Sequence, residues 1–271
     1  MVTNSLKNNR VIVTVDTENH VADVMLNRAD KMNAVDLKMF EALGAAADTV
    51  AADKSVRAVV LRGGGGNFCA GIDLSVIGNS GLDFGTALMR PVEPSVANIF
   101  QRAAYAWREL PIPVICAIEG VAFGAGMQIA LGADIRYASP DAKLSIMESK
   151  WGIIPDMGFT ATLRHLVSPD RAKELAWSAR ILDSMEAQAL GLITAVMADP
   201  VDAARQFAAD CATRSPDAVR GIKTLVNDAW DQTEAQALAL EARLQSGIIG
   251  GKNQIEAVMA NLEKRKPDFT D

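Results

Sequence analysis

Two glycine-rich turns are the segments of this sequence best suited to chemistry. The first, 67–74, reads NFCAGIDL; the second, 119–128, reads EGVAFGAGMQ and lies between an expected strand and an expected helix. Backbone N–H groups at the start of a helix have no partner within that helix and lie at its positive end. Two such groups from separate turns could bind one developing oxyanion. Tight turns that serve only packing are the alternative, and spacing alone favours that alternative.

Neither turn has the pattern of a nucleotide-binding loop. The first does not end in the Gly-Lys-Ser/Thr of a P-loop. The second lacks the GxGxxG spacing, and no acidic residue closes a second strand about 20 residues later, as a dinucleotide fold requires. What both turns offer is exposed backbone N–H rather than a phosphate cradle.

Together the two turns resemble the motifs of the crotonase (enoyl-CoA hydratase/isomerase) superfamily. Residues 68–74 are similar to the family pattern F-x-A-G-x-D-L, and residues 120–128 are similar to its G-x-x-x-G-G-G motif. The resemblance extends over about the whole chain through 26–28, 32–34, 133–135 and 152–155. It implies an α/β fold, the crotonase-type spiral of ββα units. It also implies a core over 1–200 with the CoA site and oxyanion hole, and a helical oligomerisation region over 201–271.

The resemblance also implies roles for single residues. The oxyanion hole would use the N–H groups of Ile72 and Ala125, although the family usually has glycine at the Ala125 position. Two glutamates activate water in family hydratases; the first position holds Gln128 in this chain and the second holds Glu148. Several isomerases of the family use a third acidic position, which here is Asp156.

Gln128 is the departure that bears on the reaction. An amide can form hydrogen bonds but cannot transfer a proton at neutral pH, so hydration by two glutamates is not available in its usual form. Glu148 and Asp156 are left as the catalytic pair, one to take a proton and the other to return it or to raise its partner's pKa. This favours double-bond isomerisation of a 3-enoyl-CoA or 3,5-dienoyl-CoA. Hydration of a trans-2-enoyl-CoA to a 3-hydroxyacyl-CoA is the alternative.

Other reactions and roles stay open at this point. Dienoyl-CoA isomerases carry an acid at the Gln128 position, so the match to them is incomplete. Thioester hydrolysis and decarboxylation use the same oxyanion hole. A non-catalytic acyl-CoA binding protein is a different class, but the carboxyl groups of Glu148 and Asp156 argue against it. Asp156 could instead cap a following helix.

The expected substrate contacts come from both turns and from the N-terminal element that meets CoA in relatives. These residues are Arg28, Lys31, Ala34, Ala70, Asp73, Leu74, Gln128 and Trp151. Asp73 is expected to be a structural or substrate-loop carboxylate rather than a base, Asp134 a structural carboxylate, and His165 a structural histidine. Near the C-terminus, the basic cluster 264–266 could reach the CoA of a neighbouring subunit and Phe269 could stack on its adenine. A solvated helix end is the simpler interpretation of that cluster.

Composition bounds the class of protein. The 271 residues carry a net charge of −6, so nucleic acid is not an expected partner. Three widely spaced cysteines predict neither a disulfide framework nor a metal site, and they fit a reducing cytoplasm. No signal peptide is evident, and the apolar stretch 114–135 carries charged residues, so no membrane association is predicted. No cofactor is expected, because coenzyme A is part of the substrate.

Periodicity predicts the elements that must position the two turns. Strands are expected as a hairpin within 10–27 and at 57–62, 114–118 and 143–146. Helices are expected from an Asp36 cap, over 95–109, over 124–132 and over 157–167. A mobile loop is expected over 78–94, where it would shape the acyl pocket. Helical periods from 202 to 266, broken near Pro216 and at 247–251, carry apolar faces that fit a homotrimer or a dimer of trimers.

Overall fold

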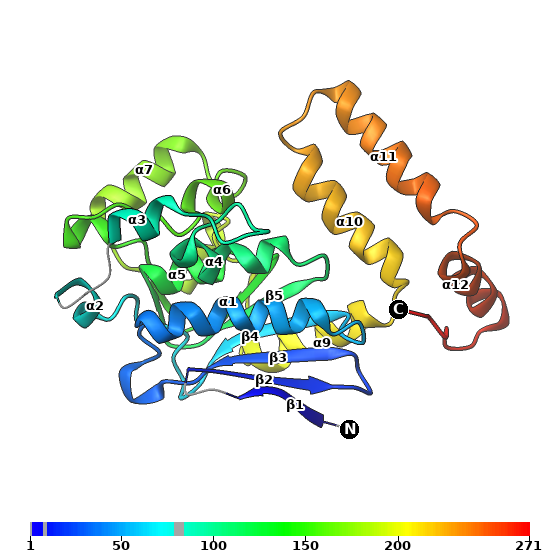
Figure 1. Cartoon of the computed structure of the whole chain (residues 1–271), viewed down its shortest axis with the longest axis horizontal. Coiled ribbons are helices and arrows are strands. Elements are labelled where there is room, and N and C mark those ends of the chain that lie inside the picture. The colour runs from blue at the N-terminus through cyan, green and yellow to red at the C-terminus, as the bar shows by residue number, and fades with distance from the viewer. Residues whose placement is uncertain (1, 8–9, 79–83) are drawn as a thin grey trace.

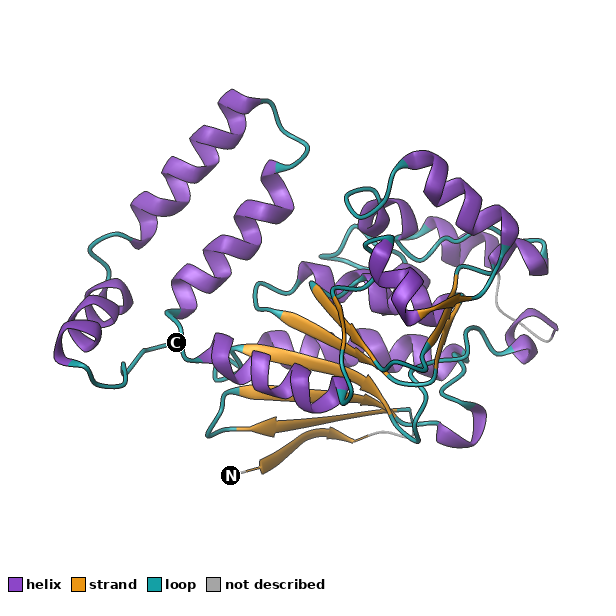
Figure 2. Cartoon of the chain, turned by 180° about the vertical axis from the view of Figure 1, so that it is seen from behind, coloured by secondary structure: helices purple, strands orange, loops and turns teal. Residues whose placement is uncertain are grey.

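A computed structural model describes residues 2–7, 10–78 and 84–271 as a mixed α/β fold with two sheets (Figures 1 and 2). The larger sheet has the strand order β1 (Val2–Lys7), β2 (Val11–Asp16), β3 (Val21–Leu26), β4 (Ala58–Gly63), β5 (Val114–Ile118), β7 (Ile135–Ala138) and β10 (Ala195–Val196). The first two pairs, β1 with β2 and β2 with β3, are antiparallel, and the later pairs are parallel. The smaller sheet consists of β6 (Val121–Phe123), β8 (Lys143–Ser145) and β9 (Leu182–Asp183). The predicted hairpin and the α/β class are confirmed.

Helices cover both faces of the larger sheet. Along β4, Val59 joins the core beneath α1 (Leu37–Ala52), whereas the next residue, Val60, joins the core beneath α9 (Pro200–Ala212). Successive side chains of a strand point to opposite faces, so both must be apolar when both faces are covered. This explains the apolar run 58–61 that opens β4, and Figure 2 shows α9 lying across the sheet.

The chain repeats a strand–strand–helix unit. β2 and β3 lead into α1, and β5 and β6 lead into α5 (Ala125–Leu131). In the second unit the strands separate, β5 into the larger sheet and β6 into the smaller one. The predicted helix over 124–132 matches α5, with Gly124 as its N-cap residue.

Local capping signals set the starts of two further helices. The Asp36 carboxylate accepts a hydrogen bond from the Met39 N–H at 2.9 Å and caps α1, as predicted. The predicted helix over 95–109 begins later, as α4 (Ile99–Glu109), because Asn98 and Gln101 form a capping box. The predicted helix over 157–167 is shorter, as α6 (Phe159–Leu163).

Two segments correct the sequence prediction. Residues 2–7 form an edge strand where none is predicted, since their sequence lacks apolar alternation and only the pairing with β2 reveals the strand. The loop predicted over 78–94 contains the helix α3 (Phe84–Met89), preceded by α2 (Leu74–Gly78). Six residues are too few to show a helical period, and α3 depends on packing against α4. Residues 79–83 of the predicted loop lie outside the described residues.

The chain ends in an arm of three helices, α10 (Pro216–Ala229), α11 (Glu234–Ile248) and α12 (Lys252–Glu263), which extends from the α/β body (Figure 1). The predicted break near Pro216 falls at the start of α10 and the one at 247–251 falls between α11 and α12, whereas the break between α10 and α11 was not predicted. The buried Lys223 ammonium anchors α10 to the body by donating to the Trp107 and Ile112 carbonyls and to Asp134. The remaining helices are η1 (Ala29–Lys31), η2 (Glu148–Trp151), α7 (Pro169–Ser178) and α8 (Ser184–Ala189). None of the helices in the described ranges is long and apolar enough to cross a membrane.

Candidate active site

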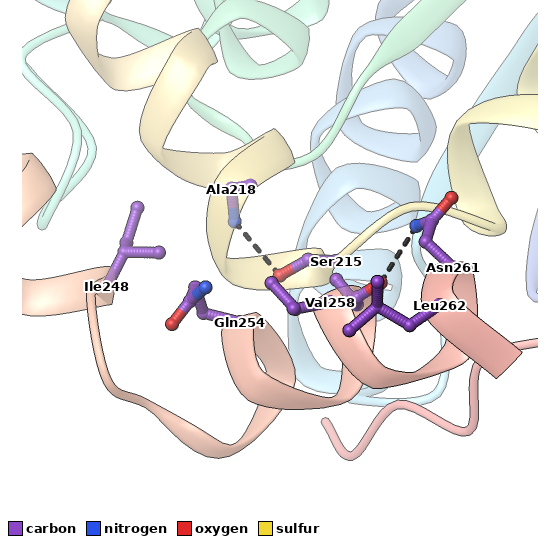
Figure 3. Close-up of a pocket in the computed structure, with 8 residues that line it drawn as sticks. Ser215, Ala218, Ile248, Gln254, Val258, Asn261 and Leu262 are labelled. Carbon is purple, nitrogen blue, oxygen red and sulfur yellow. Dashed lines mark hydrogen bonds between the residues drawn. The ribbon is translucent and has the colours of Figure 1, made fainter.

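Two cavities differ in the chemistry that they offer. A cavity of about 480 Å³ lies within the arm (Figure 3), lined by Ser215, Ala218, Ile248, Gln254, Ala257, Val258, Asn261 and Leu262. None of these side chains is ionisable, so this cavity offers no acid–base chemistry. A larger cavity of about 1070 Å³ lies in the body and is lined by both glycine-rich turns and by Glu148 and Asp156. The larger cavity is therefore the candidate active site.

Backbone hydrogen bonds of Cys69 hold the two glycine-rich turns side by side. The Cys69 N–H donates to the Val121 carbonyl at 2.9 Å, and the Phe123 N–H donates to the Cys69 carbonyl at 3.0 Å. Gly126 lies directly against this bridge, since an added Cβ would be 2.4 Å from the Cys69 carbonyl oxygen. The glycine spacing of the second turn thus has a packing reason, which is the close approach of α5 to the first turn.

Ile72 and Ala125 line the cavity, and neither N–H has an acceptor among the described residues. Next to Ile72, the Val35 N–H donates to the Gly71 carbonyl and the Asp73 N–H donates to the Val35 carbonyl, at 2.8 and 2.9 Å. This parallel pairing turns the Ile72 N–H away from Val35. Ala125 is the first residue of α5, where no carbonyl of the helix can accept its N–H. Both groups are available to a ligand oxygen, and the predicted oxyanion hole stays a prediction with this support.

Glu148 is a buried carboxyl group with one unpartnered oxygen. Its Oε1 accepts a hydrogen bond from Gln128 Nε2 at 2.6 Å, whereas its Oε2 is buried without a partner in the described part of the chain. Burial raises the pKa of Glu148, and the nearby Asp156 carboxylate raises it further. A carboxyl group with a raised pKa beside a cavity can exchange protons near neutral pH.

Asp156 lies on the cavity wall close to Glu148. Surrounding protein raises the pKa of Asp156 as well, although the side chain is open to solvent through the cavity. The alternative role as a helix cap is wrong, because the N-cap residue of α6 is Gly158 and no side chain caps that helix. The two predicted catalytic carboxyl groups therefore face one cavity, each with a raised pKa.

Gln128 joins the segments that carry these two carboxyl groups. Its side chain is buried in the cavity wall, on α5. The amide Oε1 accepts from the Met157 N–H at 2.8 Å, which leaves Nε2 to face Glu148. Both polar ends of the amide are engaged by protein groups, so the predicted substrate contact of Gln128 would be made by the remaining N–H and by packing.

Arg28 is the predicted substrate contact that does not line the cavity. Its guanidinium donates to the Ala34 carbonyl at 2.8 Å and pairs with the Asp73 carboxylate at 2.7 Å. Hydrogen bonds from Ser75, together with Arg28, lower the pKa of Asp73 to about 2. Arg28 thus fixes two residues that themselves line the cavity, and its direct contact with CoA stays a prediction. Asp73 stays ionised at neutral pH, and its predicted contact with the substrate stays a prediction.

The other predicted contacts line the cavity together: Lys31, Ala34, Ala70, Asp73, Leu74 and Trp151. Sequence reasoning missed most of the apolar wall, namely Met32, Phe40, Leu88, Phe100, Met147, Ile153, Ile154 and Met157. Phe40 and Phe100 meet edge to face with ring centroids 5.1 Å apart, although they come from different helices. Met147 and Met157 adjoin the two carboxyl residues in sequence, which is a signal that could have found them.

Asn33 is a further residue whose role the sequence did not reveal. It is fully buried; its Nδ2 donates to the carbonyls of Gly64 and Asn67, and its Oδ1 accepts from the Arg28 N–H. The side chain therefore fixes the N-terminal element against the glycine run that precedes the first turn. Its position in the MNA sequence at 32–34 was the available signal.

Residues outside the cavity take structural roles. Asp134 accepts from the Val114 N–H and from Lys223, and His165 lies 3.4 Å from the Asp231 carboxylate, in agreement with the structural roles expected of both. Phe269 is buried within its own chain, which corrects the expectation that it stacks on an adenine. Nowhere in the described ranges do three or more His, Cys, Asp or Glu side chains gather in a way that could hold a metal ion.

Comparison with known proteins places the chain among acyl-CoA enzymes. The family model for enoyl-CoA hydratase/isomerase matches residues 16–271. A mitochondrial methylglutaconyl-CoA hydratase of Mus musculus is 35% identical over 254 residues, which cover 90% of this chain and 77% of the relative. A 1,2-epoxyphenylacetyl-CoA isomerase of Escherichia coli is 35% identical, covering 93% of this chain and 96% of the relative. The peroxisomal Delta(3,5)-Delta(2,4)-dienoyl-CoA isomerase of Arabidopsis thaliana is 31% identical, with 95% of each chain covered.

Solved structures agree with these sequence matches. The crystal structure of an enoyl-CoA hydratase from Bacillus anthracis superposes with a TM-score of 0.85 and 30% identity. The superposition covers 97% of this chain and 99% of the other. The arm and the body are therefore both part of the shared fold.

Proposed function

Since the chain belongs to the enoyl-CoA hydratase/isomerase family, we propose that it moves a carbon–carbon double bond in an unsaturated acyl-CoA, either a 3-enoyl-CoA or a 3,5-dienoyl-CoA. The crotonase resemblance seen in the sequence and the crotonase-type fold are confirmed by the family match and the superposition. What carries the proposed reaction is the amide of Gln128 in the place where a second glutamate would be needed for hydration.

The proposed reaction transfers one proton and changes no mass. Glu148 or Asp156, in its ionised form, takes a proton from the carbon next to the thioester carbonyl. The electrons of that C–H bond shift into a dienolate, whose oxygen is held by the N–H groups of Ile72 and Ala125. The other carboxyl group, in its protonated form, returns a proton to the far end of the conjugated system. The double bond then lies in conjugation with the thioester.

The raised pKa values of Glu148 and Asp156 suit this exchange. A base and an acid that act in turn need pKa values nearer to neutral pH than an exposed carboxyl group has. The Asp156 carboxylate also raises the pKa of Glu148, which favours a state with one charged and one protonated carboxyl group. The reaction uses no redox step, so we propose no cofactor apart from the coenzyme A of the substrate itself.

Hydration of a trans-2-enoyl-CoA is the second candidate. The 35% identity to a methylglutaconyl-CoA hydratase favours it. In that case Glu148 or Asp156 would have to activate water without a second glutamate at position 128. The remaining reactions of the oxyanion hole have no specific observation in their favour.

The arm supports the proposed homotrimer or dimer of trimers. Leu238, Ile249 and Leu262 are each more than 60% exposed in the single chain, and other large apolar side chains of the arm are exposed with them. Covering such apolar side chains with a second copy would be favourable. Analytical ultracentrifugation tests this, and a monomer at micromolar concentration would contradict it. A cytoplasmic location is likewise a proposal, based on the three unpaired cysteines.

The test of the reaction is a comparison of three substrates: a trans-2-enoyl-CoA, a 3-enoyl-CoA and a 3,5-dienoyl-CoA. Products would be followed by mass and by ultraviolet absorbance. Conversion of the 3-enoyl or 3,5-dienoyl substrate without a change in mass supports the proposal. Rapid gain of water by the 2-enoyl substrate, with no migration in the others, would establish the hydratase instead.

A further inference from the structure

We propose that Gln128 is a positioning residue that keeps both carboxyl groups of the site in register with the oxyanion donors and sets the pH at which Glu148 exchanges its proton. This inference rests on the acid–base function proposed above for Glu148 and Asp156. It gives Gln128 a specific task rather than treating it as the loss of a glutamate.

The position of Gln128 in α5 ties it to the helix start that carries the Ala125 N–H. Gln128 follows Ala125 by one helical turn, and its N–H donates to the Gly124 carbonyl at 3.0 Å. The side chain is only 1% exposed, so it is fixed by packing as well as by hydrogen bonds. A shift of Gln128 therefore requires a shift of the helix start that carries the Ala125 N–H.

The side-chain amide of Gln128 makes two hydrogen bonds to other segments of the site. Nε2 donates to Glu148 Oε1 at 2.6 Å, and Oε1 accepts from the Met157 N–H at 2.8 Å. Met157 directly follows Asp156, so this second bond fixes the backbone that carries the Asp156 carboxyl group. One side chain thus connects the oxyanion helix, Glu148 and the Asp156 segment.

Only an amide satisfies both neighbours at once. The Met157 N–H needs an acceptor, and the ionised Glu148 Oε1 needs a donor; glutamine provides one of each. A carboxylate at position 128 would place two acceptor oxygens about as close as Nε2 and Oε1 are now, at 2.6 Å. The pair could then exist only by sharing a proton. Glutamine therefore lets Glu148 titrate without sharing its proton with residue 128.

Gln128 reaches only one of the two oxygens of the Glu148 carboxyl group. Oε1 accepts a hydrogen bond from the amide, whereas Oε2 is buried with no partner in the described residues, so Gln128 is the side chain that stabilises the ionised form of Glu148. The charged groups that face the same cavity are Asp156, Asp30, Lys31 and Asp73. Of these, Asp156 is the one that acts on the titration of Glu148.

The test measures the titration of Glu148 directly, in Gln128→Met and in Gln128→Glu. Carboxyl carbons of glutamate labelled with ¹³C are followed by NMR against pH, and the Glu148 signal is assigned by its loss in Glu148→Gln. Methionine fills the space but donates no hydrogen bond, so the midpoint of Glu148 should rise by about one pH unit or more. With the 3-enoyl-CoA substrate, kcat should fall on the order of 10-fold or more while KM stays within about threefold.

Met127→Leu is the matched control, because Met127 is a fully buried neighbour on the same helix and does not line the cavity. Its Glu148 midpoint and kcat should equal those of the wild type. An unchanged Glu148 midpoint in folded Gln128→Met would overturn the proposal, as would an equal shift in Met127→Leu. The NMR titration needs no turnover, so it decides the role of Gln128 even if no enoyl-CoA is isomerised.

Gln128→Glu keeps the test decisive if the methionine variant fails to fold. Its two carboxyl groups should titrate as a coupled pair, with one midpoint well above that of wild-type Glu148. A Glu148 signal that titrates as in the wild type, with no coupling to a second group, would overturn the proposed contact.

Discussion

Replacing Gly126 with alanine tests whether close contact between the two turns creates the oxyanion site. An added Cβ would lie 2.4 Å from the Cys69 carbonyl oxygen, whereas ordinary contact begins at 3.4 Å. Helix α5 and the first turn must therefore separate by about 1 Å, and misplacement on that scale can reduce a rate about 100-fold. Loss of one oxyanion donor reduces kcat by about 100-fold to 1000-fold, which is about 2.7–4 kcal/mol. We expect Gly126→Ala to lower kcat on the order of 100-fold or more.

Gly44→Ala is the matched control. Gly44 also lies within a helix, α1, but the nearest atom to an added Cβ is 3.7 Å away, on the side chain of Arg102. Helix propensity predicts that each glycine-to-alanine change stabilises the fold by up to about 1 kcal/mol. For Gly126→Ala alone, the close approach of the Cys69 carbonyl oxygen predicts that the change destabilises the fold.

The assay compares kcat and thermal unfolding of both variants with those of the wild type. The expected result is a lower unfolding midpoint and a large loss of kcat for Gly126→Ala, with neither loss for Gly44→Ala. Wild-type kcat and unfolding temperature in Gly126→Ala would refute the reasoning, because the two turns would then not depend on their contact.

Three further substitutions test separate parts of the account. Glu148→Gln should lower kcat about 100-fold to 10,000-fold without loss of acyl-CoA binding, as kinetics and calorimetric titration would show. Because burial raises the pKa of Glu148 in the folded state, protonated Glu148 contributes stability at low pH, and this contribution is lost as pH rises through that pKa. Urea unfolding of Glu148→Gln at a series of pH values should lack this loss. Asp73→Asn should leave the acidic limb of the pH–rate profile in place, since a group with a pKa of about 2 stays ionised there, and a shift of that limb would argue that Asp73 is the base. Lys223→Met should cost about 2–3 kcal/mol in urea unfolding, because it leaves the Trp107 and Ile112 carbonyls without this donor and Asp134 without its cation; a cost below about 0.5 kcal/mol would show that the arm does not depend on this anchor.

Features fixed by short stretches of chain were predictable from the sequence. The Asp36 cap depends on a bond across three residues, and the glycine-rich turns have glycine where the backbone needs it. At Gly71 and Gly124, φ is +99° and +50°, values that other residues rarely adopt. The motif spacing therefore carried both the family resemblance and the place of the two carboxyl groups that we propose as catalytic.

Features that depend on distant parts of the chain were not predictable in this way. Arg28 looked like a cation for CoA, and only the folded chain shows that Asp73 and the Ala34 carbonyl take up its guanidinium. The same holds for Gln128, whose partner Met157 is 29 residues away. Periodicity reports which face of an element is buried but not which side chains meet across the cavity.

The central claim is that Glu148 moves a proton of an acyl-CoA whose thioester oxygen is held by the N–H groups of Ile72 and Ala125. Its most direct test is to incubate a 3-enoyl-CoA in D₂O with the wild type and with Glu148→Gln, and to analyse the product by mass spectrometry and deuterium NMR. The account predicts a 2-enoyl-CoA that carries carbon-bound deuterium and no added water, formed by the wild type and nearly absent with the variant. A product that contains added water, or equal rates for the two proteins, would contradict it.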